Sequence, residues 1–155
     1  MDLSDTIKIL QASHFFSGMP LDDIEKVADL CRTAEYKPGD FVFEQGNYGE
    51  CLYIIIEGKV FLERAMHTGT HKGRVLIETL GKGRTLGCWS TLLGEKHKLM
   101  SSASCQSPST LLVIPGHALR QMMLAKSHFG FNLMERLCFL LRDRIQAAYG
   151  ALDKI

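Results

Sequence analysis

The chain has 155 residues, of which 46% are hydrophobic and 23% charged, and its formal net charge is +1. This length and balance are typical of one globular domain with its own core, and they argue against a protein that coats nucleic acid. No apolar run approaches the ~18 residues of a membrane span, and the acidic start lacks the features of a signal peptide. We therefore expect a cytoplasmic protein with no membrane contact and no direct nucleic-acid binding.

Two helices are predicted at the start of the chain. Residues from about 4 to 12 carry apolar side chains at helical spacing. Pro20 suits the first turn of a second helix, and the acids that follow it suit the positive end of a helix dipole. The apolar side chains of this second helix recur every three or four residues, at Leu21, Ile24, Val27 and Cys31. We assign residues 1–31 to N-terminal helices.

The next part of the chain, residues 32–114, has the pattern of many short strands. Runs of β-branched and aromatic residues alternate with turns rich in glycine. A polar hairpin tip is placed at residues 66–73. This pattern predicts a closed roll or barrel of about eight strands. The clearest strands are residues 41–44, 51–56, 60–63, 74–80, 100–105 and 110–114.

Residues 115–155 are predicted to be helical, with a first helix at 116–125 and a second from Ser127, the expected N-cap, to about 152. The second helix carries two neighbouring apolar stripes, which is wider than one small roll needs to cover. The extra width suits a helix–helix seam with a second copy of the chain. We therefore expect a homodimer through Leu133, Leu137, Leu140, Leu141 and Ile145. The whole chain, residues 1–155, is interpreted as a single domain.

Residues that often carry chemistry are present without a supporting pattern. The five cysteines are widely spaced, so we expect small buried side chains and no disulfide framework. His67 and His71 have a spacing that binds metals on a helix, but glycine and threonine place them in a hairpin. No arrangement for nucleophilic or acid–base catalysis stands out. We expect no enzyme activity, no catalytic residue and no metal site.

One segment carries a family resemblance. Residues 36–60, YKPGDFVFEQGNYGECLYIIIEGKV, contain a Pro-Gly-acid turn, a Gln-Gly turn, a Leu-Tyr-Ile strand and Glu-Gly-x-Val. This order resembles the cyclic-nucleotide-binding domain of the catabolite activator and Fnr-type regulators, which also occurs in gated channels and kinases. The resemblance covers about residues 10–148. It implies a mainly β fold with flanking helices: a double-stranded β-helix, that is, a jelly-roll or cupin-like β-roll.

The family's phosphate-binding cassette is altered in this chain. Gly87 matches the family glycine, but Cys88 stands where the family has the glutamate that accepts from the ribose. The family arginine that holds the phosphate has no counterpart. Counting back from Ile114 puts Leu99 at its place, and counting forward from Gly87 puts His97 or Lys98 there.

Several residues around this cassette remain candidates for binding a ligand. Backbone N–H groups at the start of a short helix would cradle an anion, a lysine would add charge and serines would add hydroxyl donors. On a strand, only one of two successive serines points inward. The candidates are Gly87, Cys88, Trp89, Ser90, Lys98, Leu99, Ser101 and Ser102.

Three outcomes stay open for this altered pocket. It binds a cyclic nucleotide (cAMP or cGMP) weakly, it binds another small anionic ligand, or it has lost small-molecule binding and acts through protein contacts. We interpret the chain as a ligand-sensing regulatory domain. The alternatives are a degenerate β-roll that serves as a protein-interaction module, and the sensory half of a Crp/Fnr-type transcription regulator. The sequence does not identify the downstream protein partner.

Overall fold

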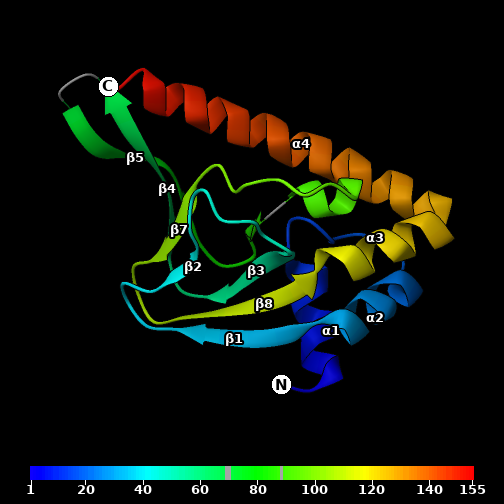
Figure 1. Cartoon of the computed structure of the whole chain (residues 1–155). Helices are drawn as coiled ribbons and strands as arrows, with labels where there is room; N and C mark the ends of the chain where they lie inside the picture. Colours follow the sequence, from blue (N-terminus) through cyan, green and yellow to red (C-terminus); the bar gives the residue numbers. More distant parts are fainter. Residues whose placement is uncertain (69–70, 88) are drawn as a thin grey trace.

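The computed structural model describes residues 1–68, 71–87 and 89–155. Two helices precede eight described strands, a 3₁₀ helix interrupts the strands, and two helices end the chain (Figure 1). The elements are α1 (Leu3–Ala12), α2 (Leu21–Leu30), β1 (Arg32–Tyr36), β2 (Phe41–Phe43), β3 (Cys51–Glu57), β4 (Val60–Thr68), β5 (His71–Leu80), β6 (Thr85–Gly87), η1 (Trp89–Leu93), β7 (Ser102–Cys105), β8 (Ser109–Pro115), α3 (Gly116–Ala125) and α4 (Ser127–Leu152).

The strands form two four-stranded sheets with the orders β1-β8-β3-β6 and β2-β7-β4-β5. Every pair of named strands is antiparallel. The sheets face each other as a roll, and α4 runs along one side of it (Figure 1). The predicted mainly β fold of about eight strands with flanking helices is confirmed.

Two buried clusters fill the molecule. One lies between the helices and the outer face of the first sheet, and the other lies inside the roll. Successive residues of β3 serve both, because Ile54 belongs to the helical cluster and Ile55 to the roll cluster. Leu111 and Leu112 of β8 divide in the same way. A sheet that is buried on both faces needs apolar residues at every position, which explains the unbroken run in β3.

Two predicted boundaries are wrong. The polar hairpin tip expected at residues 66–73 is largely strand, with Met66 opposite Gly73 and His67 opposite Lys72. The outer part of β4 includes exposed residues, so polar and apolar side chains do not alternate along it. Without that alternation, the sequence does not distinguish a strand from a turn there. Ser127 is the first residue of α4 and not its cap. The N-cap is Lys126, whose Nζ lies 2.8 Å from the buried Asp23 carboxylate.

The cysteines differ from one another in exposure. Burial raises the pKa of Cys31 to about 12, and its thiol donates to the carbonyl of Val27 at 3.2 Å. Cys105 is buried, whereas Cys51 is half-buried. Cys138 is exposed, so the expectation of a buried side chain is wrong there. Within the described ranges, no helix is both long and apolar enough to span a bilayer.

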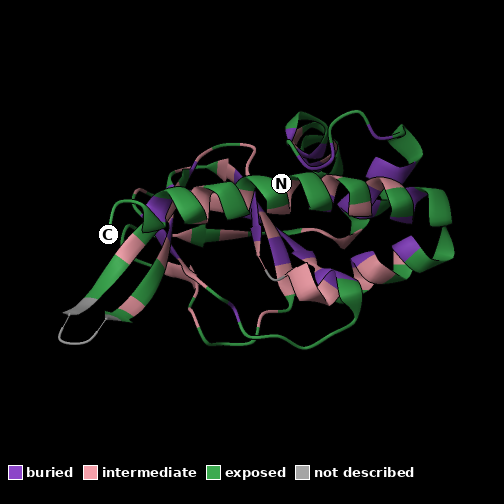
Figure 2. Ribbon diagram, turned by 90° about the horizontal axis from the view of Figure 1, so that it is seen from above, coloured by how far each residue is buried: buried purple, intermediate pink, exposed green. Residues whose placement is uncertain are grey.

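The long helix α4 has an inner and an outer face. Leu133 and Leu137 are buried in the chain's own core, while Leu140 and Leu141 pack partly against it. Figure 2 shows the outer face as largely exposed. Two of the five residues expected in a dimer seam are therefore taken up by the fold itself, because α3, α4 and the first sheet close over them.

Candidate ligand-binding cavity

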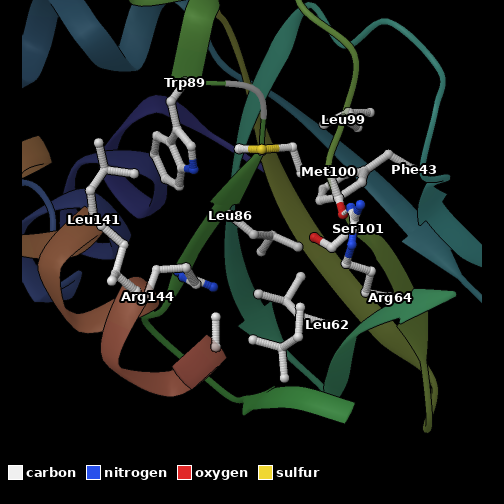
Figure 3. A pocket seen from close by; sticks show the side chains of 14 residues that line it. Phe43, Leu62, Arg64, Leu86, Trp89, Leu99, Met100, Ser101, Leu141 and Arg144 are labelled. Atoms are coloured by element: carbon white, nitrogen blue, oxygen red, sulfur yellow. Dashed lines mark hydrogen bonds between the residues drawn. The ribbon is translucent and has the colours of Figure 1, made fainter. Parts of the chain in front are cut away.

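A cavity of about 370 Å³ lies between the roll and α4. This volume falls within the range of small-molecule sites. Figure 3 shows side chains from the strands, the segment around η1 and the long helix converging on it. The lining residues are Phe43, Leu62, Arg64, Ile77, Leu86, Gly87, Trp89, Leu99, Met100, Ser101, Leu141, Arg144, Ile145 and Ala148.

Most of this lining is apolar, and among the described residues its only charged side chains are those of two arginines. Arg64 extends from β4, and its guanidinium donates to the carbonyl of Met100. Arg144 extends from α4 and donates to the carbonyl of Thr85 at 2.8 Å. No Asp or Glu is among the described residues that line the cavity. The cavity therefore has a positive charge that an anionic ligand would neutralise.

The charge of Arg144 is only partly balanced. Its side chain is 16% exposed, and desolvation by burial lowers the pKa of its guanidinium. The nearest acid is Glu78, whose Oε2 lies 3.6 Å from Nε of Arg144. That carboxylate is shared, because its Oε1 lies 2.8 Å from Arg84. Two guanidiniums on one carboxylate leave one positive charge in excess, and desolvation increases the cost of leaving it unpaired.

Four of the predicted site residues line the cavity. Gly87 ends β6, Trp89 begins η1, and Leu99 and Ser101 lie on the segment that leads to β7. The Trp89 ring also packs against Phe15, with 6.2 Å between ring centroids, so it contacts both the cavity and the helical core. Cys88, which is also predicted to bind the ligand, lies outside the described residues.

Three predicted site residues lie elsewhere. Lys98 is exposed, and its backbone forms an isolated antiparallel β-bridge with that of Tyr48. The hydroxyl of Ser102 accepts from the backbone N–H of Gln45 at 2.9 Å, on the other side of the strand from Ser101. Ser90 is not among the residues that line the cavity. These three side chains are therefore not placed to contact a ligand inside the cavity.

The backbone fixes which residue occupies the inward position in the altered cassette. The N–H of Leu99 donates to the carbonyl of Asn47 at 2.8 Å, and its own carbonyl accepts from Gly46 at 2.8 Å. These two bonds hold the Leu99 side chain, which is 7% exposed, toward the cavity. The place that counting back from Ile114 assigns to the family arginine is thus occupied by an alkyl group.

Sequence reasoning missed both arginines of the cavity. Arg64 was detectable, because it continues the inward alternation of Val60 and Leu62 along one strand. Arg144 was also detectable as a charged residue in line with the apolar stripe of Leu133, Leu137 and Leu140. Both charges come from a strand and a helix that lie outside the cassette.

The comparisons with known proteins agree with this geometry. The sequence model described as "Cyclic nucleotide-binding domain" matches residues 33–126. Human cGMP-dependent protein kinase 2 is 30% identical over 78 residues, which are 50% of this chain and 10% of the kinase. The chain thus aligns with one tenth of the length of that relative.

Solved structures share the fold. A cyclic nucleotide-binding domain from Methylobacillus flagellatus superposes with a TM-score of 0.78 at 19% identity, covering 99% of this chain and 84% of that one. The sensor domain of the transcriptional regulator DNR from Pseudomonas aeruginosa gives a TM-score of 0.74 at 18% identity and covers 93% of both chains.

Proposed function

Because the chain belongs to the cyclic nucleotide-binding domain family, we propose that it is a cytoplasmic, non-enzymatic regulatory domain that senses a small anionic ligand in the cavity under α4. The observation that carries the proposal is the pair Arg64 and Arg144 on an otherwise apolar lining. Guanidiniums bind phosphate and carboxylate groups through paired N–H donors. The apolar lining strengthens such contacts most at Arg144, whose side chain is 16% exposed, whereas Arg64 is exposed.

We also propose that cyclic nucleotides bind this cavity weakly. Leu99 occupies the place of the family arginine and supplies no donor for a phosphate. A lost hydrogen bond to a charged group costs about 1.5–3 kcal/mol, or roughly 10- to 160-fold in affinity. Arg64 and Arg144 approach from other walls, so they favour an anion placed differently from the family's phosphate.

Signalling would use α4 as the moving part. Four cavity residues, Leu141, Arg144, Ile145 and Ala148, lie on this helix. A ligand that contacts Arg144 in one position of the helix and not in another shifts the population toward the contacting state. The likeness to the DNR sensor domain supports a related reading, in which the chain is the sensory half of a Crp/Fnr-type transcription regulator.

The proposal is tested by calorimetric titration of the chain with cAMP and cGMP. Because Trp89 is the single tryptophan and lines the cavity, its fluorescence gives a second readout. We expect dissociation constants of about 10 μM or weaker, and at least about tenfold further weakening in Arg64→Gln. Lys98→Gln is the matched control, because Lys98 is an exposed cation outside the cavity, and it should bind like the wild type.

Three results would contradict this reading. Nanomolar binding of either cyclic nucleotide would show that the altered cassette does not weaken affinity. Equal weakening in Arg64→Gln and Lys98→Gln would show that the ligand senses the overall charge and not the cavity. If cyclic nucleotides and a thermal-shift screen of small anions all leave the protein unchanged, ligand sensing is wrong and the protein-interaction alternative is favoured.

A homodimer through the outer face of α4 is the second part of the proposal. Apolar or thiol side chains recur there every seven residues, the spacing of one coiled-coil position: Phe131, Cys138, Ile145 and Leu152. All four are exposed, with Phe131 at 66%. This seam takes the place of the predicted one, which included Leu133 and Leu137, because those two residues are buried within the chain. Ile145 also lines the cavity, so the seam adjoins the ligand site.

Light scattering tests the dimer. The wild type is expected at twice the monomer mass at ~100 μM, and Phe131→Glu is expected to be monomeric, because a carboxylate at the seam repels its copy. Mild oxidation should link Cys138 to Cys138 in the wild type and not in Cys138→Ser. A wild-type chain that is strictly monomeric at this concentration would refute the dimer.

A further inference from the structure

A second cavity, of about 270 Å³, lies beside the first and has different chemistry. It is bounded by the segment after α1, the start of β6 and the middle of α4, which includes Arg144. Its basic lining residues are Arg84, Arg136, Arg144 and His14. Three guanidiniums around one small cavity are unusual, because like charges repel one another unless an anion lies between them.

The acids near this cavity do not balance these charges. Asp143, the one carboxylate among the described residues that line it, pairs with Arg142 at 3.1 Å. Glu78 is shared between Arg84 and Arg144. Arg136 donates to the carbonyl of Phe15 at 3.1 Å and makes no ion pair among the described residues. A net positive charge therefore remains on the cavity wall.

An unpaired hydroxyl provides an independent observation. Thr85, which is 2% exposed, lines the cavity, and its Oγ1 has no hydrogen-bond partner in the part of the chain that the structure describes. Buried polar groups in folded proteins are nearly always paired. The backbone carbonyl of the same residue accepts from the guanidinium of Arg144. The unpaired hydroxyl thus belongs to a residue of the cavity wall, and a hydroxyl is a donor that a phosphate oxygen accepts.

We propose that this second cavity binds a small phosphate-bearing anion, held by the guanidiniums of Arg136, Arg84 and Arg144. Guanidiniums match the oxygens of a phosphate through their planar set of donors. The volume is smaller than that of a typical drug-sized site, so the ligand is inorganic phosphate, pyrophosphate or a short phosphomonoester. Phe139, at 53% exposure, and the buried Phe15 provide an apolar wall for a few carbons.

The two cavities are separable by mutation. Arg136 lines only the second cavity and Arg64 only the first, whereas Arg144 lines both. The second site therefore depends on two arginines, Arg84 and Arg136, that the proposed function does not use, and the shared Arg144 is left unchanged in its test. Lys98 provides a matched control, because it is an exposed cation outside both cavities.

The test is calorimetric titration of the full chain with inorganic pyrophosphate at constant ionic strength. We expect a dissociation constant below about 1 mM, and at least about tenfold weaker binding in Arg136→Gln. Lys98→Gln and Arg64→Gln should stay within about twofold of the wild type. No detectable binding to the wild type, or equal weakening in Lys98→Gln, would overturn the proposal.

A second pair of variants guards against misfolding of Arg136→Gln. Phe139 is exposed at the rim, so Phe139→Glu and Phe139→Gln should both keep the fold. The carboxylate variant is expected to bind pyrophosphate at least about tenfold more weakly than the amide variant, because it repels an anion. Equal affinity of the two variants would overturn the proposal. Loss of binding in Arg64→Gln alone would place the anion in the first cavity, which refutes the second site and supports the proposed function.

Discussion

Gly87 combines a cavity wall with a close contact between strands. Its φ is +141°, and a Cβ built there would lie 2.5 Å from the carbonyl oxygen of Cys51 and 2.8 Å from Cα of Leu52. Both neighbours are backbone atoms of a strand that pairs with β6, so they cannot move aside without breaking the sheet. The glycine that the family cassette shares is thus required by packing as well as by the turn.

Alanine at two glycines separates these effects. Gly87→Ala should lower the free energy of unfolding by about 3 kcal/mol, because backbone strain adds to the contact with β3. Gly46 has a φ of +89° but nothing within 4 Å of a built Cβ. Gly46→Ala should therefore lose only about 1–2 kcal/mol. Urea unfolding measures both, and equal losses would mean that the close contact has no energetic weight.

At the scale of elements, α4 serves two purposes on two faces. Its inner face supplies Phe129, Leu133 and Leu137 to the helical core. Its outer face exposes residues such as Phe131, Cys138 and Ile145. Its wide apolar surface was predicted, and the structure explains it by placing half of the surface inside the chain and half outside. One apolar face of the helix thus stabilises the domain, while the apolar side chains on the other face remain exposed.

Truncations on the two faces should behave differently. Leu133 is fully buried, so Leu133→Ala should lower the free energy of unfolding by about 3 kcal/mol through lost burial and a cavity. Phe131→Ala should change it by less than about 0.5 kcal/mol at a protein concentration where the chain is monomeric. Thermal and urea unfolding measure both variants. A large loss in Phe131→Ala under these conditions would contradict the assignment of its face.

At the scale of the whole molecule, the two cores meet at β3 and β8. These strands pair with neighbours on both edges and are buried on both faces, whereas the C-terminal part of α4 contacts the roll through the cavity lining. Local opening is rare where backbone bonds and apolar contacts are dense, and frequent where they are sparse. The domain thus combines a sheet that is buried on both faces with a helix whose C-terminal part borders the cavity.

Amide hydrogen exchange should report this difference. Leu52 to Ile55 and Leu111 to Ile114 are expected to exchange slowest, and residues 141–148 of α4 at least about tenfold faster. Millimolar cyclic AMP should slow exchange at residues 141–148 and leave β3 and β8 unchanged, because the ligand contacts the helix. Unchanged exchange in α4 in a sample whose Trp89 fluorescence reports binding would contradict a role of this helix in sensing.

The sequence by itself determined the fold of this protein. The glycine-spaced turns and apolar strands of residues 36–60, and the helical spacing on either side, specify local structure through interactions between near neighbours. It also located the cavity wall at Gly87, Trp89, Leu99 and Ser101, because these lie in the segment that the family uses.

Only the tertiary structure decided which side chains line that cavity together. Arg64 and Arg144 are 80 residues apart in the chain and meet because a strand and a helix pack on the same hollow. Leu99 and not Lys98 lines the cavity, because two backbone hydrogen bonds join Leu99 to the turn at residues 46–47. The division of α4 into a core face and an outer face depends on where α3 and the first sheet lie. A local pattern indicates that each arginine faces inward, but contacts of this kind join distant parts of the chain, so the pattern does not show which residues meet.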